Sequence, residues 1–540
     1  MKERTPLIKI DLHGSPLSAV KNRSDYSSYR CSAGDEIVSN AEELMGNINV
    51  VEDEFEQLVK LALPIIVTYA LEVLPSVVTI LFVGHVESEK IDEQIAAASL
   101  SVLLLNVTAM ATGFGLATAL DTLCSQAYGA GNTVRMGVYL QTSFLVLSAW
   151  YLFVYAINFN SSEILQLLGQ PVAVAQLAGK FSRQLLPGVP FMYLYDLLKR
   201  VLLAQNIANP MIYVAILVNI INISLGYYLC FHTTLGFLGA AVSRAVSNIC
   251  CPVIFIPYML YSGLMTPLWA GFKWKNALDG VQEFLELGIP GMLQVCLEWW
   301  AFEAIALLCG LLPNDPVAAI GSNSLILNMS YLTWTLYSGV SGAAKIRVGN
   351  ALGAGSPVRA TVVWKISMIL AALISLVGCF CYLAFRTKLP GLFTHEKSIQ
   401  TLTKSLMYVA AAFQVADSIN CVAGGILQGS RRQVLGAKLN FIAYYFAGLP
   451  LGILFGFSMH LGVIGLWIGV TIGIYVTAIV GVKIVSESNW PQLCLQAQNR
   501  TSKSDTPDFQ LHNYESISES IQTNIPLQTG VNEIDMFYGT

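Results

Sequence analysis

Apolar runs of 19 or more residues recur along most of this 540-residue chain, and they limit its possible folds more than any other feature. A helix that spans a bilayer needs about 20 consecutive, mainly apolar residues. Hydrophobic residues make up 54% of the chain and charged residues only 12%, which is about half the charged fraction of an average soluble protein. The sequence therefore predicts an all-α polytopic membrane protein.

We predict twelve transmembrane helices, with disordered polar tails at residues 1–54 and 489–540. The polar first 30 residues argue against a cleavable signal peptide. The predicted helices cover residues 59–84, 95–120, 136–158, 173–197, 210–231, 236–261, 281–311, 316–344, 360–385, 400–427, 435–458 and 462–485.

Basic residues mark one side of the membrane. Arg135, Lys345, Arg431 and most other loop Lys and Arg residues follow even-numbered predicted helices, so the positive-inside rule predicts that both termini are cytosolic. Short sorting patterns at residues 3–8 and 514–517 leave the plasma membrane and a vacuolar or endosomal membrane as alternatives.

The chain repeats itself. Residues 125–135 follow the second predicted helix and recur as residues 349–359 after the eighth, at an offset of 224. Other positions recur at an offset of 226, namely Pro64 and Pro290, and Glu72 and Glu298.

This repeat indicates a duplication of six helices. Both halves then have the same orientation, and a pseudo-two-fold axis along the membrane normal relates them. We expect two six-helix lobes, residues 55–265 and 266–488, around a central cavity that alternates between the two sides of the membrane.

Three carboxylates interrupt the apolar runs: Glu72, Glu298 and Asp417. An ionised carboxylate at bilayer depth costs about 3 kcal/mol on insertion scales, so such residues commonly serve ion or substrate sites. Burial favours the neutral form, so an acid of this kind can exchange a proton for a cation. We predict a proton-coupling and substrate-binding site from these three and Glu303, although Glu303 projects about 140° away from Glu298 on one helix.

Uncharged residues complete the predicted cavity. Indole faces attract organic cations, so Trp299 and Trp300 are candidates for the cavity lining. Tryptophans equally often fill packed or lipid-facing surfaces. Gln294, Asn106 and Asn328 are further cavity candidates, although buried amides more often hydrogen-bond between helices.

Other patterns exclude function classes. Residues 129–131 and 353–355 lack the lysine of a phosphate loop, so we interpret them as tight turns that let helix ends approach closely. Asp196, Lys199 and Arg200 have the spacing of a solvated ion pair at a helix end. No catalytic motif or Cys/His metal spacing is present, so we expect no enzyme activity, metal or cofactor, and a net charge of −4 implies no nucleic-acid partner.

Taken together, these motifs resemble the MATE (multidrug and toxic compound extrusion) family of transporters, over residues 55–488. The resemblance is carried by Gly84-His85, residues 121–131, Pro290 with Glu298-Trp-Trp, residues 347–355 and residues 424–429. The Glu-Trp-Trp and Gly-Asn-Ala-Leu-Gly-Ala-Gly forms point to the eukaryotic branch.

The resemblance implies a monomeric secondary antiporter that exports organic cations, xenobiotics or amphipathic metabolites across a lipid membrane, driven by protons or, alternatively, by sodium. The family's acids fall on Glu298, Glu303 and Asp417. This chain departs from relatives in having Thr79 and Asn328 where some carry acids. A lipid or lipid-linked oligosaccharide flippase of the same superfamily, which would need a cationic cavity, and a channel are the alternatives.

Overall fold

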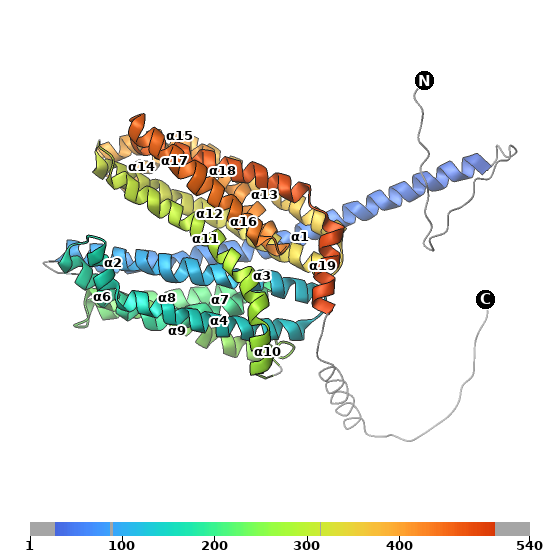
Figure 1. The fold of residues 1–540 in the computed structure, drawn as a ribbon, viewed down its shortest axis with the longest axis horizontal. Helices are drawn as coiled ribbons and strands as arrows, with labels where there is room; N and C mark the ends of the chain where they lie inside the picture. Colours follow the sequence, from blue (N-terminus) through green and yellow to red (C-terminus); the bar gives the residue numbers. More distant parts are fainter. Residues whose placement is uncertain (1–27, 87–89, 270, 314, 503–540) are drawn as a thin grey trace, which may run out of the picture. The chain divides into compact units, whose positions relative to one another are not determined.

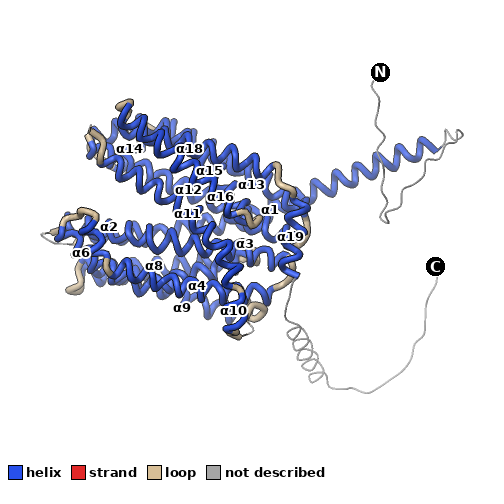
Figure 2. Tube along the Cα trace, in the orientation of Figure 1, coloured by secondary structure: helices blue, strands red, loops and turns tan. Residues whose placement is uncertain are grey.

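The computed structural model describes residues 28–86, 90–269, 271–313 and 315–502, and every regular element in these residues is a helix (Figures 1 and 2). The predicted all-α class is therefore confirmed. Both sorting patterns, at residues 3–8 and 514–517, lie outside the described residues.

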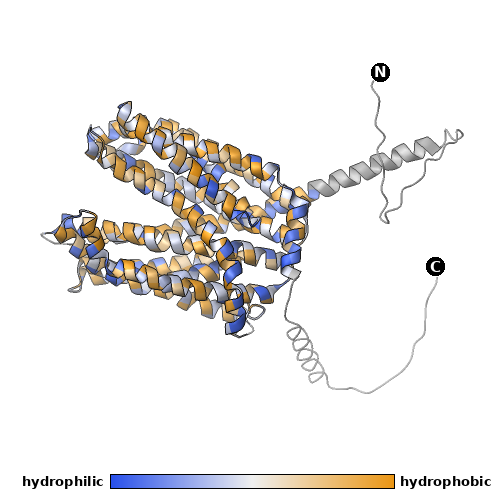
Figure 3. Ribbon diagram, viewed as in Figure 1, coloured by the Kyte–Doolittle hydropathy of each residue, from blue (hydrophilic) through white to orange (hydrophobic). Residues whose placement is uncertain are grey.

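Ten of the described helical segments are long and apolar enough to cross a membrane. Figure 3 shows apolar residues along the length of these segments and hydrophilic residues on α10 and α19. The predicted spans 173–197 and 316–344 coincide with helices that are not among the ten, so the count of twelve spans remains a prediction.

We call the helices from Glu54 to Tyr261 the N-lobe. Their bounds are α1 (Ser28–His85), α2 (Ile91–Leu105), η1 (Asn106–Met110), α3 (Ala111–Gly129), α4 (Thr133–Phe159), α5 (Ser161–Leu167), α6 (Val172–Leu185), η2 (Leu186–Gly188), α7 (Val189–Ala204), α8 (Asn209–Phe231) and α9 (Phe237–Tyr261).

We call the helices from Val281 to Ser486 the C-lobe, which α10 (Trp274–Asp279) precedes and α19 (Trp490–Ser502) follows. The C-lobe helices are α11 (Val281–Gly310), α12 (Pro316–Gly353), α13 (Pro357–Phe385), α14 (Leu389–Phe393), α15 (Lys397–Gly429), α16 (Gln433–Asn440), η3 (Phe441–Gly448), α17 (Leu449–Ile453), η4 (Leu454–Ser458) and α18 (Gly462–Ser486).

The structure has helices in both segments that were predicted to be disordered tails. Helix α1 begins at Ser28, well before the predicted boundary at residue 54, in a stretch with good helix formers at residues 41–45. Helix α19 buries Trp490, Cys494 and Ala497, whose spacing places them on one face. The segment is polar on average, so its composition did not reveal this amphipathic pattern.

Helix α3 lies at the centre of the bundle. Its residues from Gly115 to Ala127 are all buried, and it contacts α4 and α7 of the N-lobe as well as α11 and α12 of the C-lobe. A helix that is buried on every side needs small side chains where neighbouring backbones come close. Helix α3 is therefore the main N-lobe surface against which the C-lobe packs.

The ends of α3 and α12 cross in direct backbone contact. A Cβ atom on Gly129 would collide with the carbonyl oxygen of Asn350, and one on Gly353 would collide with that of Gln126. These contacts are equivalent under the repeat offset of 224, so the crossing lies on the pseudo-two-fold axis. The glycines that follow, Gly131 and Gly355, have φ of 75° and 70°, which supports the predicted tight turns. We call this end of the bundle the glycine end.

Substituting either crossing glycine by valine should push the lobes apart. We expect Gly129→Val and Gly353→Val each to destabilise the protein by about 1–3 kcal/mol, because backbone atoms cannot move aside as a side chain can. The measurement is the thermal unfolding midpoint in detergent. Gly378→Val is the matched control, since a Cβ at Gly378 of α13 meets open space. Equal midpoints for the control and the two crossing variants would contradict this account.

Candidate functional site

A cavity of about 250 Å³ lies between the two lobes. Helices α1, α3 and α7 line it from the N-lobe, and α11, α12, α15 and α16 line it from the C-lobe. The predicted cavity residues Glu298, Glu72, Gln294 and Trp299 all line it.

Glu298 projects into this cavity from the middle of α11, one turn after Gln294. Among the described residues, no lysine or arginine forms a salt bridge with it. The Asn440 amide, at the end of α16, is within hydrogen-bonding reach of Glu298 and donates to the Gln294 carbonyl oxygen at 3.0 Å. Because no described basic residue pairs with Glu298, its charge is uncompensated when it is ionised.

Asp417 lies behind the cavity wall rather than in it. Its side chain is 4% exposed and accepts a hydrogen bond from the Tyr337 hydroxyl of α12. Cys421, one turn later on α15, does line the cavity. Asp417 therefore sits one helical turn from the lining, with a neutral donor as its described partner.

A chain of ion pairs forms the opposite wall. Lys199 forms salt bridges with Glu72 at 2.9 Å and with Asp196 at 3.4 Å, and Arg200 forms one with Asp196 at 2.7 Å. Arg200 also pairs with Asp121, which in turn accepts from Lys345 of the C-lobe at 2.6 Å. Three acids face three bases in this network: Glu72, Asp196 and Asp121 face Lys199, Arg200 and Lys345.

The predicted solvated ion pair at Asp196 is therefore corrected. The spacing did place Asp196 beside Lys199 and Arg200, but the side chains are only 6%, 9% and 13% exposed. They are buried because Glu72 and Asp121, from other helices, complete their pairing. A sequence window on one helix does not contain those partners.

Aromatic rings from both lobes stack beside the acids. The Tyr69 ring of α1 stacks with Trp334 of α12 at 6.4 Å between ring centroids, and Trp334 stacks with Tyr331 at 5.5 Å. All three rings line the cavity, as does Trp299. The cavity thus combines flat apolar faces with one uncompensated carboxylate, an arrangement suited to an organic cation.

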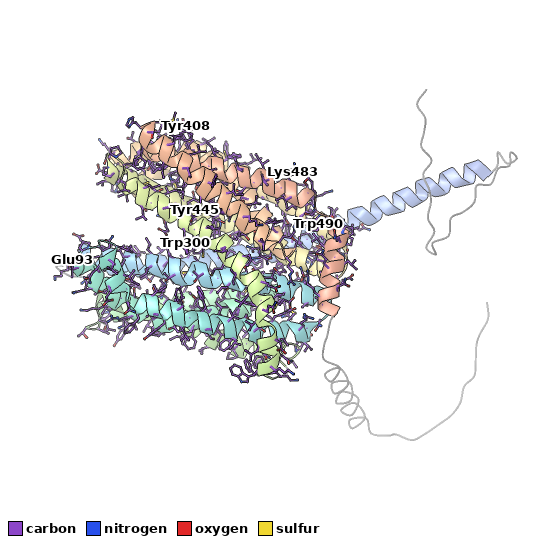
Figure 4. All side chains as sticks on the ribbon, viewed as in Figure 1. Glu93, Trp300, Tyr408, Tyr445, Lys483 and Trp490 are labelled. Atoms are coloured by element: carbon purple, nitrogen blue, oxygen red, sulfur yellow. The ribbon has the colours of Figure 1, made fainter. Side chains whose placement is uncertain are left out.

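Besides Asp417, four predicted residues do not line the cavity. Trp300 follows Trp299 by about 100° on the helix and is 41% exposed; Figure 4 labels it on α11. Glu303 lies about 140° from Glu298, and the same rotation takes it off the cavity. Asn106 begins η1, and Asn328 is exposed and donates to the Ser324 carbonyl oxygen of its own helix at 2.9 Å.

Three residues at the site, Asp121, Lys345 and Tyr337, were not among the predicted site residues. One signal was available for the first two, since Asp121 and Lys345 are separated by the repeat offset of 224 and so occupy equivalent positions with opposite charge. Nothing local marks Tyr337, because its partner Asp417 is on another helix.

Removing the cation that pairs with Glu72 should destabilise the fold. Lys199→Met leaves Glu72 without a described ion-pair partner, and breaking a buried pair costs about 3 kcal/mol. Because Glu72 is 31% exposed, we expect about 2 kcal/mol, measured as a lower thermal unfolding midpoint. Lys60→Met, which breaks a pair exposed by 71% and 60%, is the matched control and should change the midpoint little. A control shift as large as that of Lys199→Met would refute the burial argument.

Comparison with known proteins matches this chain to one family. A family model described as MatE matches residues 64–228 and 290–454, two segments at the offset of 226 that separates Pro64 from Pro290. Mouse multidrug and toxin extrusion protein 1 is 33% identical over 83% of this chain and 77% of its own length. Protein DETOXIFICATION 16 of Arabidopsis thaliana is 33% identical over 86% of this chain and 95% of its own length.

The fold agrees with this assignment. The crystal structure of the eukaryotic MATE transporter AtDTX14 superimposes with a TM-score of 0.79, at 31% identity, covering 84% of this chain and all of that one. The uncompensated Glu298, the duplicated lobes and these similarities lead to one conclusion: the chain belongs to the MATE family, whose members are transporters and not enzymes.

Proposed function

We propose that this protein exports organic cations or amphipathic metabolites in exchange for protons, by alternating access of its two lobes. The proposal rests on one observation: Glu298 lines the cavity without a described basic partner. Three carboxylates line the cavity, and within the described part of the chain Glu72 and Asp196 are paired with bases while Glu298 is not.

Charge balance explains why one carboxylate suffices. The six-residue ion network contributes no net charge to the cavity, so an ionised Glu298 sets the local potential and attracts a cation. Protonation removes that attraction and releases the cation. Each proton that binds thus replaces one positive charge of substrate, which is the stoichiometry of an antiporter.

Asp417 and Glu303 take secondary roles in this proposal. Asp417 lies one turn behind the lining residue Cys421, where it can exchange a proton with the cavity after a small movement of α15. Glu303 belongs to the same helix as Glu298 and would serve a part of the proton path away from the substrate.

The lobes provide the alternation. Two hydrogen bonds join the lobes between the cavity and the glycine end: Thr122 donates to the Gln428 carbonyl oxygen at 2.6 Å, and Gln126 donates to the Gly429 carbonyl oxygen at 3.1 Å. We infer a state that is closed at the glycine end, which we assign to the cytosolic side together with both termini. The host membrane is the plasma membrane or a vacuolar or endosomal membrane, and a monomer suffices because the cavity lies between lobes of one chain.

The flippase alternative loses support from the same network. A pyrophosphate-linked lipid needs a cationic cavity, and Lys199, Arg200 and Lys345 do line this one. Each of these bases, however, already has an acid partner within 3.5 Å. The net field therefore favours a cation over a phosphate.

The test uses proteoliposomes with an acidic interior and a labelled organic cation outside. We expect the pH gradient to drive uptake, and Glu298→Gln, which cannot ionise, to reduce uptake to the leak rate while the protein stays folded. Glu163→Gln is the matched control because Glu163 is exposed on α5, away from the cavity. Normal gradient-driven uptake by Glu298→Gln would overturn the proposed coupling.

The same vesicles distinguish the alternatives. Uptake that responds to a sodium gradient and not to the pH gradient would change the coupling ion. Steady conductance without saturation would indicate a channel. If neither gradient drives uptake of the cation, transfer of a labelled lipid-linked phosphate between leaflets tests the flippase.

A second prediction concerns the aromatic lining. Trp299→Ala should raise KM for an aromatic cation by about 5–30-fold, because a desolvated cation–π contact is worth about 1–2 kcal/mol. Trp300→Ala, the neighbouring substitution on the exposed face, should change KM less than about twofold. Concentration series of initial uptake rates provide both values. Equal effects of the two substitutions would remove Trp299 from the proposed binding site.

A further inference from the structure

Two residues of opposite charge meet on the axis that relates the lobes. Asp121 of α3 and Lys345 of α12 occupy equivalent positions of the repeat, separated by the offset of 224. The Lys345 Nζ atom lies 2.6 Å from Asp121 Oδ2, and the two side chains are 14% and 4% exposed. Equivalent positions can touch only near the symmetry axis, so this pair joins the lobes at their centre.

The two partners differ in what holds them within their own lobe. Arg200 of α7 pairs with Asp121, so the aspartate keeps an N-lobe cation if the lobes separate. Lys345 has only a neutral C-lobe partner among the described residues, the Gln428 Oε1 atom at 3.2 Å. Tyr69, Cys124 and Cys421 are further titratable groups near the pair: Asp121 acts electrostatically on Tyr69 and Cys124, and Lys345 acts on Cys421. Separation of the lobes therefore leaves Lys345 without its described anionic partner.

The pair is also positioned to block passage. Both Asp121 and Lys345 precede the crossing glycines by eight residues on their helices, so the pair lies between the backbone crossing and the cavity. Lys345 lines the cavity directly. The pair therefore lies on the side of the cavity that faces the glycine end.

Hydrogen bonds connect the pair to the turn that carries Glu298. The Gln428 Nε2 atom donates to Gln294 Oε1 at 3.2 Å, and Gln294 lies four residues before Glu298 on α11. Lys345, Gln428 and Gln294 thus form a hydrogen-bonded line from the lobe axis to the helical turn before Glu298.

We propose that Lys345 is the positioning residue of an inter-lobe gate, whose ion pair with Asp121 holds the glycine end closed and opens when the lobes rock apart. The role of this gate in a transport cycle rests on the proposed function, whereas the closure itself does not. Lys345 acts through lobe position and not through contact with substrate.

The experiment measures the opening directly. Spin labels at Val134→Cys on α4 and Val358→Cys on α13, in a background without the native cysteines, report the inter-lobe distance at the glycine end by pulsed electron resonance. Both positions are exposed, by 39% and 52%, and are equivalent in the repeat. The measurement needs neither substrate nor ion gradient.

We expect Lys345→Met to increase the ratio of long to short distances at least about tenfold, because the closed state then buries a network in which three acids face only two bases. Lys345→Arg keeps the charge and should retain the short distance. Lys365→Met, which removes an exposed lysine of α13 that has no described inter-lobe contact, is the matched control and should leave the distribution unchanged. Where Lys345→Met does not fold, Lys345→Gln, which keeps a hydrogen-bond donor but loses the charge, replaces it.

Unchanged distances in the neutral variants, or the same change in Lys365→Met, would overturn the gate. In transport assays the gate predicts a lower turnover with little change in KM for Lys345→Met, since substrate contacts persist while closure fails. A distance shift in a protein that shows no proton-coupled uptake would refute the proposed function and leave the gate standing. Proton-coupled uptake without a distance shift would refute the gate and leave the proposed function standing.

Discussion

The backbone contact between α3 and α12 is the constraint on which the rest of the structure depends. Gly129 and Gly353 let each helix approach the carbonyl groups of the other, so the lobes meet on their symmetry axis with no side chain between them. This approach brings Asp121 to Lys345 and places the buried α3 against α11. The cavity is the space that remains between the lobes next to this crossing.

Charge balance around the cavity follows from that geometry. Charges removed from water must be paired, and helices from both lobes contribute to the pairing of Glu72, Asp196 and Asp121. A network that cancels its own charge adds little long-range potential. The carboxylate left out of it, Glu298, then controls the field that an incoming substrate experiences.

The accuracy of the sequence-based predictions varied with the range of the interaction involved. The predicted helical segments coincide with observed helices because hydropathy and helical period are properties of a single segment. Glu72 and Glu298, which recur at the repeat offset of 226, line the same cavity. Trp300, Glu303, Asn106 and Asn328 lie outside the lining because membrane depth alone does not specify which face of a helix turns inward. Helix α19 was missed because four buried positions in a polar segment leave its average hydropathy low.

The sequence by itself determined the helical class, the duplication and the presence of costly acids at membrane depth, since each is encoded in local composition or in a repeat offset. It also limited the function to transport, through motifs whose family the comparisons share. Only the tertiary structure decided which acids are neutralised. Glu72 meets Lys199 and Asp121 meets Lys345 across 127 and 224 residues of chain, and such partners become neighbours only when helices pack. The distinction between a structural carboxylate and the uncompensated Glu298 is therefore a property of the packed bundle.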